Sequence, residues 1–385
     1  MTTGNSILFT THVGNPGGAE IKMLELIKAT PHSRVVLLEE GTLENTIQNY
    51  GVNVTVAKDS KSLNQYRRES SIFSAIRSIP TVIKLLSFAR KETKDVKIIV
   101  CMSQKSFLIF SLATLLRNKK LIWFMNDIVS SSHFSLFSRL VIKTFARLFS
   151  DVVVLNSQAS LHQWKKSGMY CKREVVIYSG VNDALINTSP ESINDEHSVS
   201  QLIKWKTDFS LIGMFGRISH WKGQQVLINA LKDLPKHKVI FVGGAQFEDD
   251  SYKSSLLKLA EELKVNDRII FLGHKENIFD YMKLCEVVVH CSTSPEPFGR
   301  VIVEAMLCGK IVVASDSGGP TEIIVDGETG YLYPAGNAKE LAEILSHLPI
   351  LKEREVMENA ARSRAIKFFT AKKMCVDFRN LCQQL

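Results

Sequence analysis

Two glutamates, Glu296 and Glu304, stand on either side of a glycine loop in the string PEPFGRVIVE, residues 295–304. Gly299 allows the backbone to approach a ligand closely. The apolar stretch after it predicts a helix, whose first turn offers free N–H groups and a positive dipole end to a diphosphate. Glu304 could accept hydrogen bonds from the hydroxyls of a ribose, and Glu296 from those of a second sugar. The spacing therefore indicates a sugar nucleotide as the ligand.

Two glutamates near a helix start could instead serve only as partners of the helix dipole. A bare pair at this spacing would favour that interpretation, but the surrounding sequence is more specific. Residues 309–315 predict a helix end and a buried strand, residues 317–322 a second glycine turn that opens a helix, and residues 326–332 a hairpin-like loop. The combination favours a ligand site.

The whole segment resembles the E-x7-E signature of the family 4 retaining glycosyltransferases. The resemblance implies an α/β fold of two Rossmann-like doubly wound domains that face each other across a cleft, the GT-B fold. It also implies an enzyme that moves a sugar from a nucleotide-sugar to an acceptor. The donor would lie against both glutamates and four residues between them, Phe298, Gly299, Arg300 and Val301.

A basic motif follows the first expected strand of the second half, and it resembles the G-R…K-G segment of the same family. Arg217 and Lys222 are its charged residues. A departing nucleoside diphosphate gains negative charge in the transition state, which fixed cations in a dry site stabilise. Arg217 offers a planar fork to phosphate oxygens and Lys222 a point charge. Two basic residues beside a strand are more often solvated, but together with the glutamates they predict the donor phosphate site.

Two further contacts with the donor follow from the resemblance. The base would lie near Gly273 and His274, at a strand end, and Gly17 and Gly18 would form a G-G-x-E loop beside the donor phosphate. A glycine pair after a strand is also an ordinary tight turn. No two aspartates in the chain are two residues apart, so the D-x-D pair that commonly holds Mg²⁺ is absent. We therefore expect no metal and no other cofactor.

The catalytic candidates are Glu296, Asn126 and Asp127. Asn126 stands where relatives often carry a histidine beside the transferred sugar, and its amide could bind a sugar hydroxyl. Asp127 could orient or deprotonate the acceptor, or it could cap the stretch that follows it. His133 is another candidate for the missing imidazole. The resemblance implies a same-face attack in which the departing phosphate takes the acceptor's proton and no side chain becomes covalently attached.

The bulk properties are those of a globular, two-domain protein. The chain has 385 residues, more than one domain usually holds, and 45% are hydrophobic. No apolar run is long enough for a transmembrane helix, and the N-terminus does not resemble a signal peptide. The seven cysteines include no C-x-x-C pair, which indicates reduced thiols in a cytoplasmic protein.

Strand-like and helix-like segments alternate in both halves, which predicts parallel sheets covered on both faces. The expected strands are 7–10, 34–38, 52–57, 97–102, 120–124 and 151–156, then 211–216, 239–242, 268–272, 287–290 and 310–314. Residues 187–199 are polar and predict a linker. We expect residues 1–182 to bind the acceptor and residues 183–368 the donor. A final helix at 361–381 would return to the first domain, as in relatives, so that 369–385 belong to it.

The positive charge lies in the first half. Residues 1–182 hold 24 Lys and Arg and 12 Asp and Glu, a net of +12, whereas residues 183–385 hold 24 and 27, a net of −3. Nucleic acid, anionic lipid or a phosphate-bearing acceptor could each account for it. The expected helices at 72–94 and 132–150 interleave basic and apolar residues, as helices on anionic bilayers do. A core helix with a basic outer face gives the same pattern.

We take the charge to favour peripheral contact with the inner face of a membrane. The acceptor would then be a glycan or a polyprenyl-diphosphate-linked sugar, and the donor a UDP-sugar rather than a GDP-sugar. Two alternatives stay open: a nucleotide-sugar-binding subunit that has lost turnover, and a GT-B sugar-nucleotide epimerase. A nucleic-acid binder is disfavoured because no aromatic–basic stacking motif occurs, and a dehydrogenase because G-x-G-x-x-G is absent.

Overall fold

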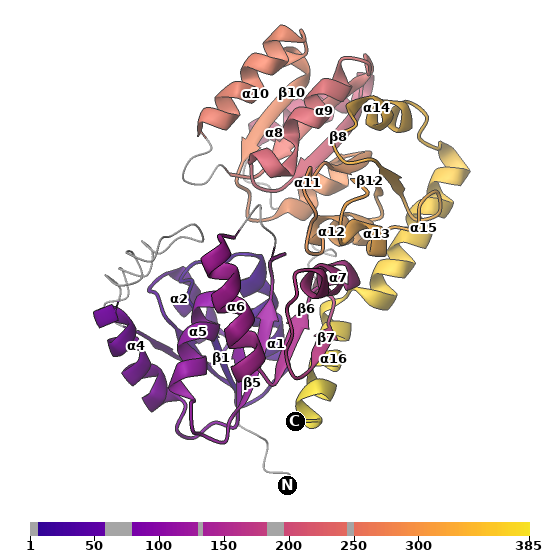
Figure 1. Ribbon diagram of the computed structural model, residues 1–385. Helices are drawn as coiled ribbons and strands as arrows, with labels where there is room; N and C mark the ends of the chain where they lie inside the picture. Colours follow the sequence, from indigo (N-terminus) through magenta and orange to yellow (C-terminus); the bar gives the residue numbers. More distant parts are fainter. Residues whose placement is uncertain (1–6, 58–78, 130–133, 183–195, 245–249) are drawn as a thin grey trace. The chain divides into compact units, whose positions relative to one another are not determined.

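The computed structural model describes residues 7–57, 79–129, 134–182, 196–244 and 250–385. The chain divides into two compact units (Figure 1). Unit 1 comprises Met1–Gly180 and Ala371–Leu385, and unit 2 comprises Val181–Thr370. Each unit is built on one parallel sheet with helices on both faces, the arrangement of a Rossmann-like domain.

The sheet of unit 1 has seven strands in the order β3-β2-β1-β4-β5-β6-β7, all parallel. Its central strands are apolar on both faces, as parallel strands covered by helices must be. The strands are β1 Ile7–Thr11, β2 Arg34–Leu37, β3 Asn53–Val56, β4 Ile98–Cys101, β5 Lys120–Met125, β6 Val152–Leu155 and β7 Glu174–Val176.

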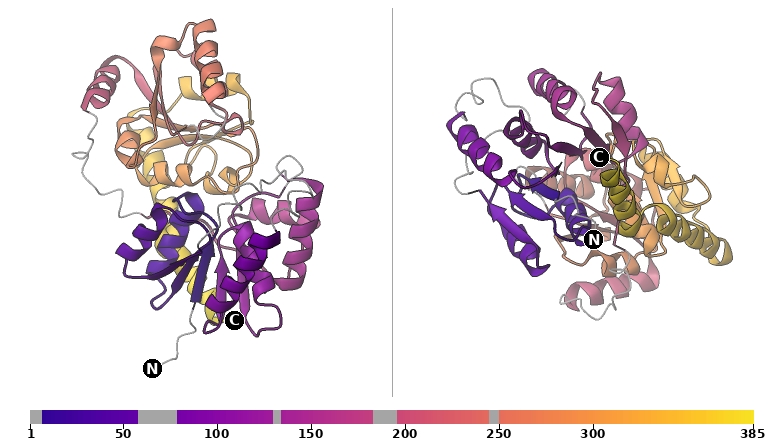
Figure 2. Two further views of the ribbon diagram at one scale, coloured as in Figure 1. Left: turned by 90° about the vertical axis from the view of Figure 1, so that its left-hand side faces the viewer. Right: turned by 90° about the horizontal axis from the view of Figure 1, so that it is seen from below.

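Two hydrophobic layers cover this sheet. One face packs against α4 Ile79–Glu92, α5 Gln104–Ala113, α6 Leu136–Phe149 and α7 Gln158–Lys166. The other packs against α1 Gly18–Lys28, α2 Thr42–Asn49 and α16 Ala371–Gln383. Neighbouring residues of β5 point to opposite layers, because side chains alternate along a strand: the Trp123 ring stacks on Phe107 at 4.3 Å, and Phe124 lies 5.8 Å from Phe378 of α16. Figure 2 shows these layers from two further directions.

The sheet of unit 2 has six parallel strands in the order β10-β9-β8-β11-β12-β13. They are β8 Ser210–Phe215, β9 His237–Val242, β10 Ile269–Gly273, β11 Val287–His290, β12 Ile311–Ser315 and β13 Tyr331–Tyr333. Its helices are α8 Glu196–Asp208, α9 Gln224–Leu231, α10 Asp250–Glu262, α11 Ile278–Leu284, α12 Arg300–Leu307, α13 Pro320–Ile323, α14 Ala338–Ser346 and α15 Leu351–Phe368. Short 3-10 turns lie at η4 His220–Lys222 and η5 Asn266–Arg268.

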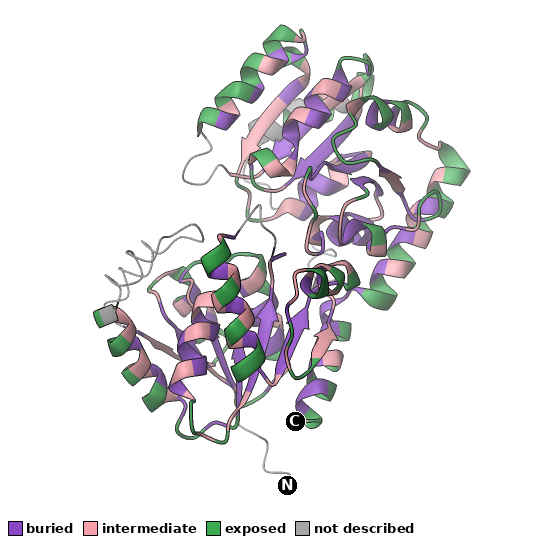
Figure 3. Cartoon of the chain, viewed as in Figure 1, coloured by how far each residue is buried: buried purple, intermediate pink, exposed green. Residues whose placement is uncertain are grey.

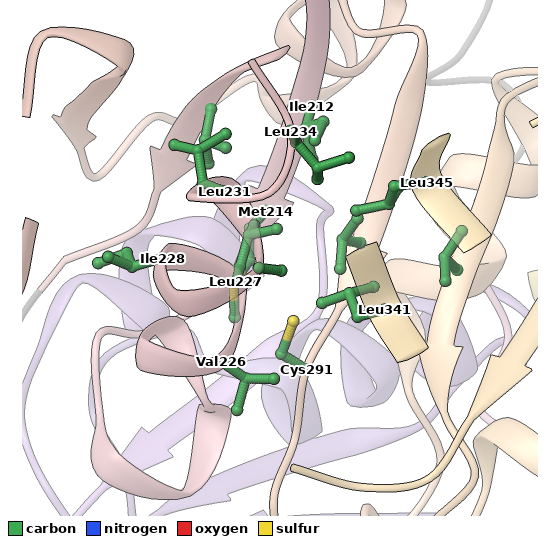
Figure 4. Packing of buried hydrophobic residues seen from close by; sticks show 14 of the residues in the cluster. Ile212, Met214, Val226, Leu227, Ile228, Leu231, Leu234, Cys291, Leu341 and Leu345 are labelled. Atoms are coloured by element: carbon green, nitrogen blue, oxygen red, sulfur yellow. The ribbon is translucent and has the colours of Figure 1, made fainter. Parts of the chain in front are cut away.

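Figure 4 shows the core of unit 2 where α9 and α14 meet the sheet. Leu227 and Leu231 of α9 and Leu341 and Leu345 of α14 pack over Ile212 of β8, and all five are at most 2% exposed. This packing fixes β8 and its carboxyl end, where the basic motif begins.

Several sequence expectations need correction. β7 and β13 were not expected, and the segment expected as a hairpin-like loop at 326–332 leads into β13, which pairs in parallel with β12. The single final helix expected at 361–381 is two helices, α15 and α16, interrupted at Phe369 and Thr370, which belong to unit 2. Residues 187–195 of the expected linker lie outside the described residues, but 196–199 form the start of α8. His133 and residues 72–78 also lie outside them.

No helix in the described chain combines the length and the apolarity needed to cross a bilayer.

All seven cysteines carry free thiols, and five of them are buried. Burial raises the pKa of Cys291 to about 12, which removes its reactive thiolate form at neutral pH.

Candidate functional site

The loop between β11 and α12 holds the two glutamates. Gly299 caps α12 with a φ of +102°, a left-handed conformation that favours glycine. Glu304 lies in the second turn of α12 and is 7% exposed. Arg300 donates from Nη2 to Glu304 Oε1 at 3.2 Å, one helical turn away. The first turn of α12 therefore presents its N–H groups beside a carboxylate whose orientation is fixed.

Glu296 is the centre of a compact polar cluster. Lys222, 74 residues earlier in the chain, donates from Nζ to both oxygens, at 3.0 Å to Oε1 and 2.8 Å to Oε2. Ser292 donates to Oε2 at 2.8 Å, and His290 Nε2 lies 3.4 Å from the same oxygen. The side chains of Lys222 and Glu296 are only 15% and 12% exposed. The ion pair is therefore largely withdrawn from water.

The surroundings of Glu296 decide its charge. Burial alone would raise the pKa of this carboxyl, but the ammonium of Lys222 and the imidazole of His290 outweigh burial and hold the pKa well below its usual range. His290 Nδ1 is buried and has no partner in the described part of the chain. The ring proton therefore belongs on Nε2, which faces Ser292 Oγ at 3.2 Å and the carboxylate. Glu296 is thus a fixed anion.

The second glycine turn, residues 317–319, packs against the backbone of the loop between β11 and α12. Glu296 N donates to Ser317 O at 3.1 Å, and Gly319 N donates to Glu296 O at 2.8 Å. A Cβ at Gly318 would lie 2.4 Å from Glu296 O, and one at Gly319 would lie 2.3 Å from Phe298 O. The two backbones approach so closely that no side chain fits between them.

We expect Gly319→Ala to destabilise unit 2 by about 2 kcal/mol, because the added methyl group meets main-chain atoms that can move only with the Glu296 loop. Gly244→Ala is the matched control, since its Cβ would lie 3.6 Å from His274 Cβ, at ordinary van der Waals distance. Urea unfolding followed by circular dichroism measures both variants. Equal unfolding midpoints for the two would show that the 317–319 turn does not constrain the loop.

Lys222 is placed by η4, which follows β8. The turn ends at Gly223, with a φ of +78°, where a Cβ would lie 2.0 Å from Cys291 O. Trp221 O accepts from Thr293 N at 2.8 Å, which ties η4 to the segment after β11. Lys222 Nζ also lies 4.2 Å from the centre of the Trp221 ring. These contacts explain how two distant motifs come together.

The remaining predicted donor residues of unit 2 are more dispersed. The side chain of Arg217 is exposed just beyond β8, and within the described residues it forms no ion pair. Gly273 ends β10 with a φ of +70°, and His274 after it is exposed. Phe298 is 3% exposed and packs edge-on against Phe369, with ring centres 5.7 Å apart, so a donor contact there would come from its backbone. Val301 is half-buried on α12.

Unit 1 places its predicted residues at the carboxyl edge of its sheet. Gly17 and Gly18 begin α1 directly after the β1 loop. Glu20 accepts from Gly17 N at 3.2 Å and from Thr11 Oγ1 at 2.9 Å. Burial raises the pKa of Glu20, and these hydrogen bonds offset that only in part. The glutamate of the G-G-x-E loop therefore holds the loop itself.

Asn126 follows β5 and belongs to a buried network. Lys22 of α1 is 1% exposed and donates from Nζ to Asn126 Oδ1 and Asn156 Oδ1, both at 2.6 Å. Asn126 Nδ2 in turn donates to Met102 O at 2.7 Å. Asp127 is half-buried, and residues 128–129 are not helical, so the described chain contains no helix for it to cap.

Sequence reasoning missed three of these side chains: His290, Ser292 and Lys22. His290 and Ser292 left a signal, because both stand at the end of an apolar strand, where polar residues of a parallel sheet gather. Lys22 left none beyond its place among the apolar residues of α1.

No group of three or more His, Cys, Asp or Glu side chains with metal-binding geometry occurs in the described residues. A groove of about 800 Å³ between α9 and α14 contains none of the predicted site residues.

Residues 197–364 match a family model described as "Glycosyl transferases group 1". A D-inositol 3-phosphate glycosyltransferase of Mycolicibacterium smegmatis is 32% identical over 162 residues, 40% of this chain and 37% of its own length. An N-acetyl-alpha-D-glucosaminyl L-malate synthase of Bacillus anthracis is 24% identical over 261 residues, 60% of this chain and 65% of its own. The chain thus spans between about a third and two thirds of these curated relatives.

Solved structures match over the full length. The crystal structure of Anabaena Alr3699/HepE in complex with UDP and glucose superposes with a TM-score of 0.86 and 30% identity, covering 99% of this chain and 100% of that one. A sucrose-phosphate synthase from Thermosynechococcus elongatus superposes with a TM-score of 0.78 and 19% identity, covering 99% of both chains, and shares the fold.

Proposed function

We propose that this chain, which belongs to the group 1 glycosyltransferases of the GT-B fold, transfers a sugar from UDP to a carbohydrate or lipid-linked acceptor. In this proposal the transfer retains the anomeric configuration and needs no metal ion. The principal support is the Lys222–Glu296 ion pair at the carboxyl ends of β8 and β11, close to the start of α12. The Anabaena relative has been crystallised with UDP and with UDP-glucose, which supports UDP as the carrier here.

Unit 2 binds the donor in this proposal. The N–H groups of the first turn of α12 and the exposed guanidinium of Arg217 face the diphosphate, and Glu304 accepts from the ribose hydroxyls. Gly273 and His274 border the base. Glu304 has the burial and the Arg300 contact that fix its carboxylate for this task.

Glu296 binds the transferred sugar. Each carboxylate oxygen can accept about two hydrogen bonds. Oε2 accepts from Lys222 and Ser292 and faces His290, whereas among the described residues Oε1 accepts only from Lys222. Oε1 therefore keeps a lone pair for a sugar hydroxyl. Because its pKa is low, Glu296 is a carboxylate at neutral pH and accepts this hydrogen bond as an anion.

The charge of the departing diphosphate is stabilised by protein groups. The sequence contains no D-x-D pair, and Lys222, Arg217 and the α12 dipole supply the positive potential that a cation would otherwise provide. The acceptor attacks from the face that the diphosphate leaves, and the diphosphate takes its proton. Positioning and electrostatics then provide the rate, without a covalent intermediate on a side chain.

Unit 1 binds the acceptor, with Gly17 and Gly18 beside the donor phosphate and Asn126 and Asp127 beside the reacting hydroxyl. The basic character of residues 1–182 fits a diphosphate-linked acceptor and an anionic membrane surface. We propose a role in polysaccharide or glycolipid synthesis, in the cytoplasm and against the inner face of the membrane.

Glu304→Gln should weaken UDP binding at least about tenfold, because the amide replaces one acceptor oxygen with an NH2 donor and lacks the negative charge that attracts the ribose hydroxyls. Calorimetric titration with UDP, GDP and ADP, without added metal, measures this directly. Glu358→Gln is the matched control: it removes the Arg354–Glu358 pair, which has the same i,i+4 spacing as Arg300–Glu304 but lies on α15.

Nucleotide binding and turnover of the sugar nucleotide together separate the alternatives. Failure of wild-type protein to bind any nucleotide would reject the donor site. UDP binding without donor hydrolysis or transfer to any acceptor would favour the non-catalytic subunit, and turnover of the sugar nucleotide to its epimer would favour the epimerase.

A further inference from the structure

The outer face of α6 carries large apolar side chains that point away from the core of unit 1. Leu136, Leu140 and Leu148 are 77%, 61% and 59% exposed, and Phe137 is 36% exposed. The spacing of about four residues keeps them on one face, with Thr144 in the remaining place. We call Leu136, Phe137, Leu140 and Leu148 the α6 ridge. Figure 3 shows the exposed stripe along this helix.

The helix does not need this ridge for folding. Its opposite face already contributes Ile142 and Ala146, both fully buried, to the core, and Phe145 packs beside them. An isolated exposed leucine is ordinary on a protein surface, but several on one helix face indicate an interaction site.

Basic side chains border the ridge. Arg139, Lys143 and Arg147 follow one another at the same spacing along one edge of it, and α6 contains no acidic residue. Residues 79–150 contain 12 Lys and Arg and 3 Asp and Glu, a net charge of +9 that equals the net charge of the entire chain. The basic edge of the ridge therefore attracts anions.

We infer that the α6 ridge docks on an anionic lipid bilayer. The leucines would enter the boundary between headgroups and acyl chains, with the helix axis in the membrane plane, and Lys143 and Arg147 would meet the headgroup phosphates. A second copy of the chain is a poorer occupant, because a symmetric contact through the ridge would bring the basic edges of both copies together. A bilayer offers both an apolar layer and negative charge.

Docking in this way orients unit 1 toward a membrane-bound substrate. A helix that follows a parallel strand runs back along it, so α6 begins on the side of the sheet where β5 ends and Asn126 follows. The inference deepens the proposed function and rests on it for the lipid-linked acceptor. The membrane contact itself requires neither donor nor acceptor.

The test is sedimentation of the full chain with phosphatidylcholine vesicles that contain or lack phosphatidylglycerol, at low and high salt. We expect binding only to the anionic vesicles, reduced by salt, and a loss of at least about tenfold in partitioning for Leu136→Asp/Leu140→Asp. The matched control is Val356→Asp, an equally exposed apolar residue on α15 at 63%, which should bind vesicles like the wild type. Calorimetry with UDP on every variant checks the donor site separately.

Absence of wild-type binding to anionic vesicles at low salt would overturn the inference, as would equal binding by the double variant. A dimer in analytical ultracentrifugation that dissociates in the double variant, without vesicle binding, would assign the ridge to a second copy and also overturn it. Vesicle binding through the ridge by a protein that does not bind UDP would leave the membrane contact in place and reject the proposed donor site alone.

Discussion

Replacing Lys222 by methionine should slow sugar transfer by roughly a hundred- to a thousandfold, the usual cost of removing one donor from a preorganised charge-stabilising site. Methionine keeps an unbranched side chain of similar length beside Trp221 but removes both hydrogen bonds to Glu296, at 2.8 and 3.0 Å. It also removes the cation that we propose for the departing diphosphate. UDP should bind more weakly for the same reason.

The same substitution should change the pH dependence of transfer. In the wild type the pKa of Glu296 lies well below its usual range. The charged carboxylate therefore contributes its full stabilisation above the ordinary carboxyl pKa, and this contribution is lost as the pH falls through the lowered pKa of the folded protein. Without Lys222 the burial of Glu296 remains and its main charge partner is gone, so its pKa rises. We expect an acid limb in the kcat/KM profile at higher pH than in the wild type.

Profiles for the wild type, Lys222→Met and Lys232→Met measure this effect. Lys232 is an exposed lysine at the end of α9 and serves as the control for loss of one positive charge. A Lys222→Met enzyme within about threefold of the wild-type rate, with an unchanged acid limb, would exclude the ion pair from the mechanism.

The sequence was sufficient to predict both motifs of unit 2, because glycine loops at the ends of apolar strands converge on one edge of a parallel sheet. It predicted a task for Lys222 and another for Glu296, but it did not predict that they pair. That contact depends on Gly223 approaching Cys291 O and on the Trp221–Thr293 hydrogen bond. A close approach between main-chain atoms requires a glycine, which is visible in the sequence. The sequence does not show which backbone atom that glycine approaches.

Long-range contacts also explain the errors in the fold. β13 has three residues, too few for a periodic signal, and it forms because β12 offers a free edge. The break between α15 and α16 is stabilised by tertiary structure, since Phe369 is buried and its carbonyl accepts from Val181 N at 2.9 Å. In α6 both faces are apolar, so periodicity alone could not distinguish Phe145, which packs on the core, from Leu140, which is exposed.

The buried ammonium of Lys22 gives the second large effect that we expect. Asn156→Leu should destabilise unit 1 by about 3 kcal/mol, because it removes one of the two 2.6 Å acceptors from a charge that is 1% exposed. Leucine keeps the branched shape of asparagine without its hydrogen-bonding atoms but is larger, so a second variant is needed to separate the lost charge partner from the change in packing. Urea unfolding monitored by tryptophan fluorescence is suited to this measurement, since Trp123 and Trp164 are buried in the core of unit 1.

The double variant Lys22→Met/Asn156→Leu should recover more than half of that loss. Methionine fills the space of the lysine stem without a charge, and replacing a buried charge together with its partner by apolar groups is often neutral, whereas removing only the partner is costly. Asn126 keeps its bond to Met102 O at 2.7 Å but loses its donor, so sugar transfer should stay reduced even where stability returns. Strict additivity of the two substitutions in the free energy of unfolding would show that Lys22 and Asn156 do not interact energetically.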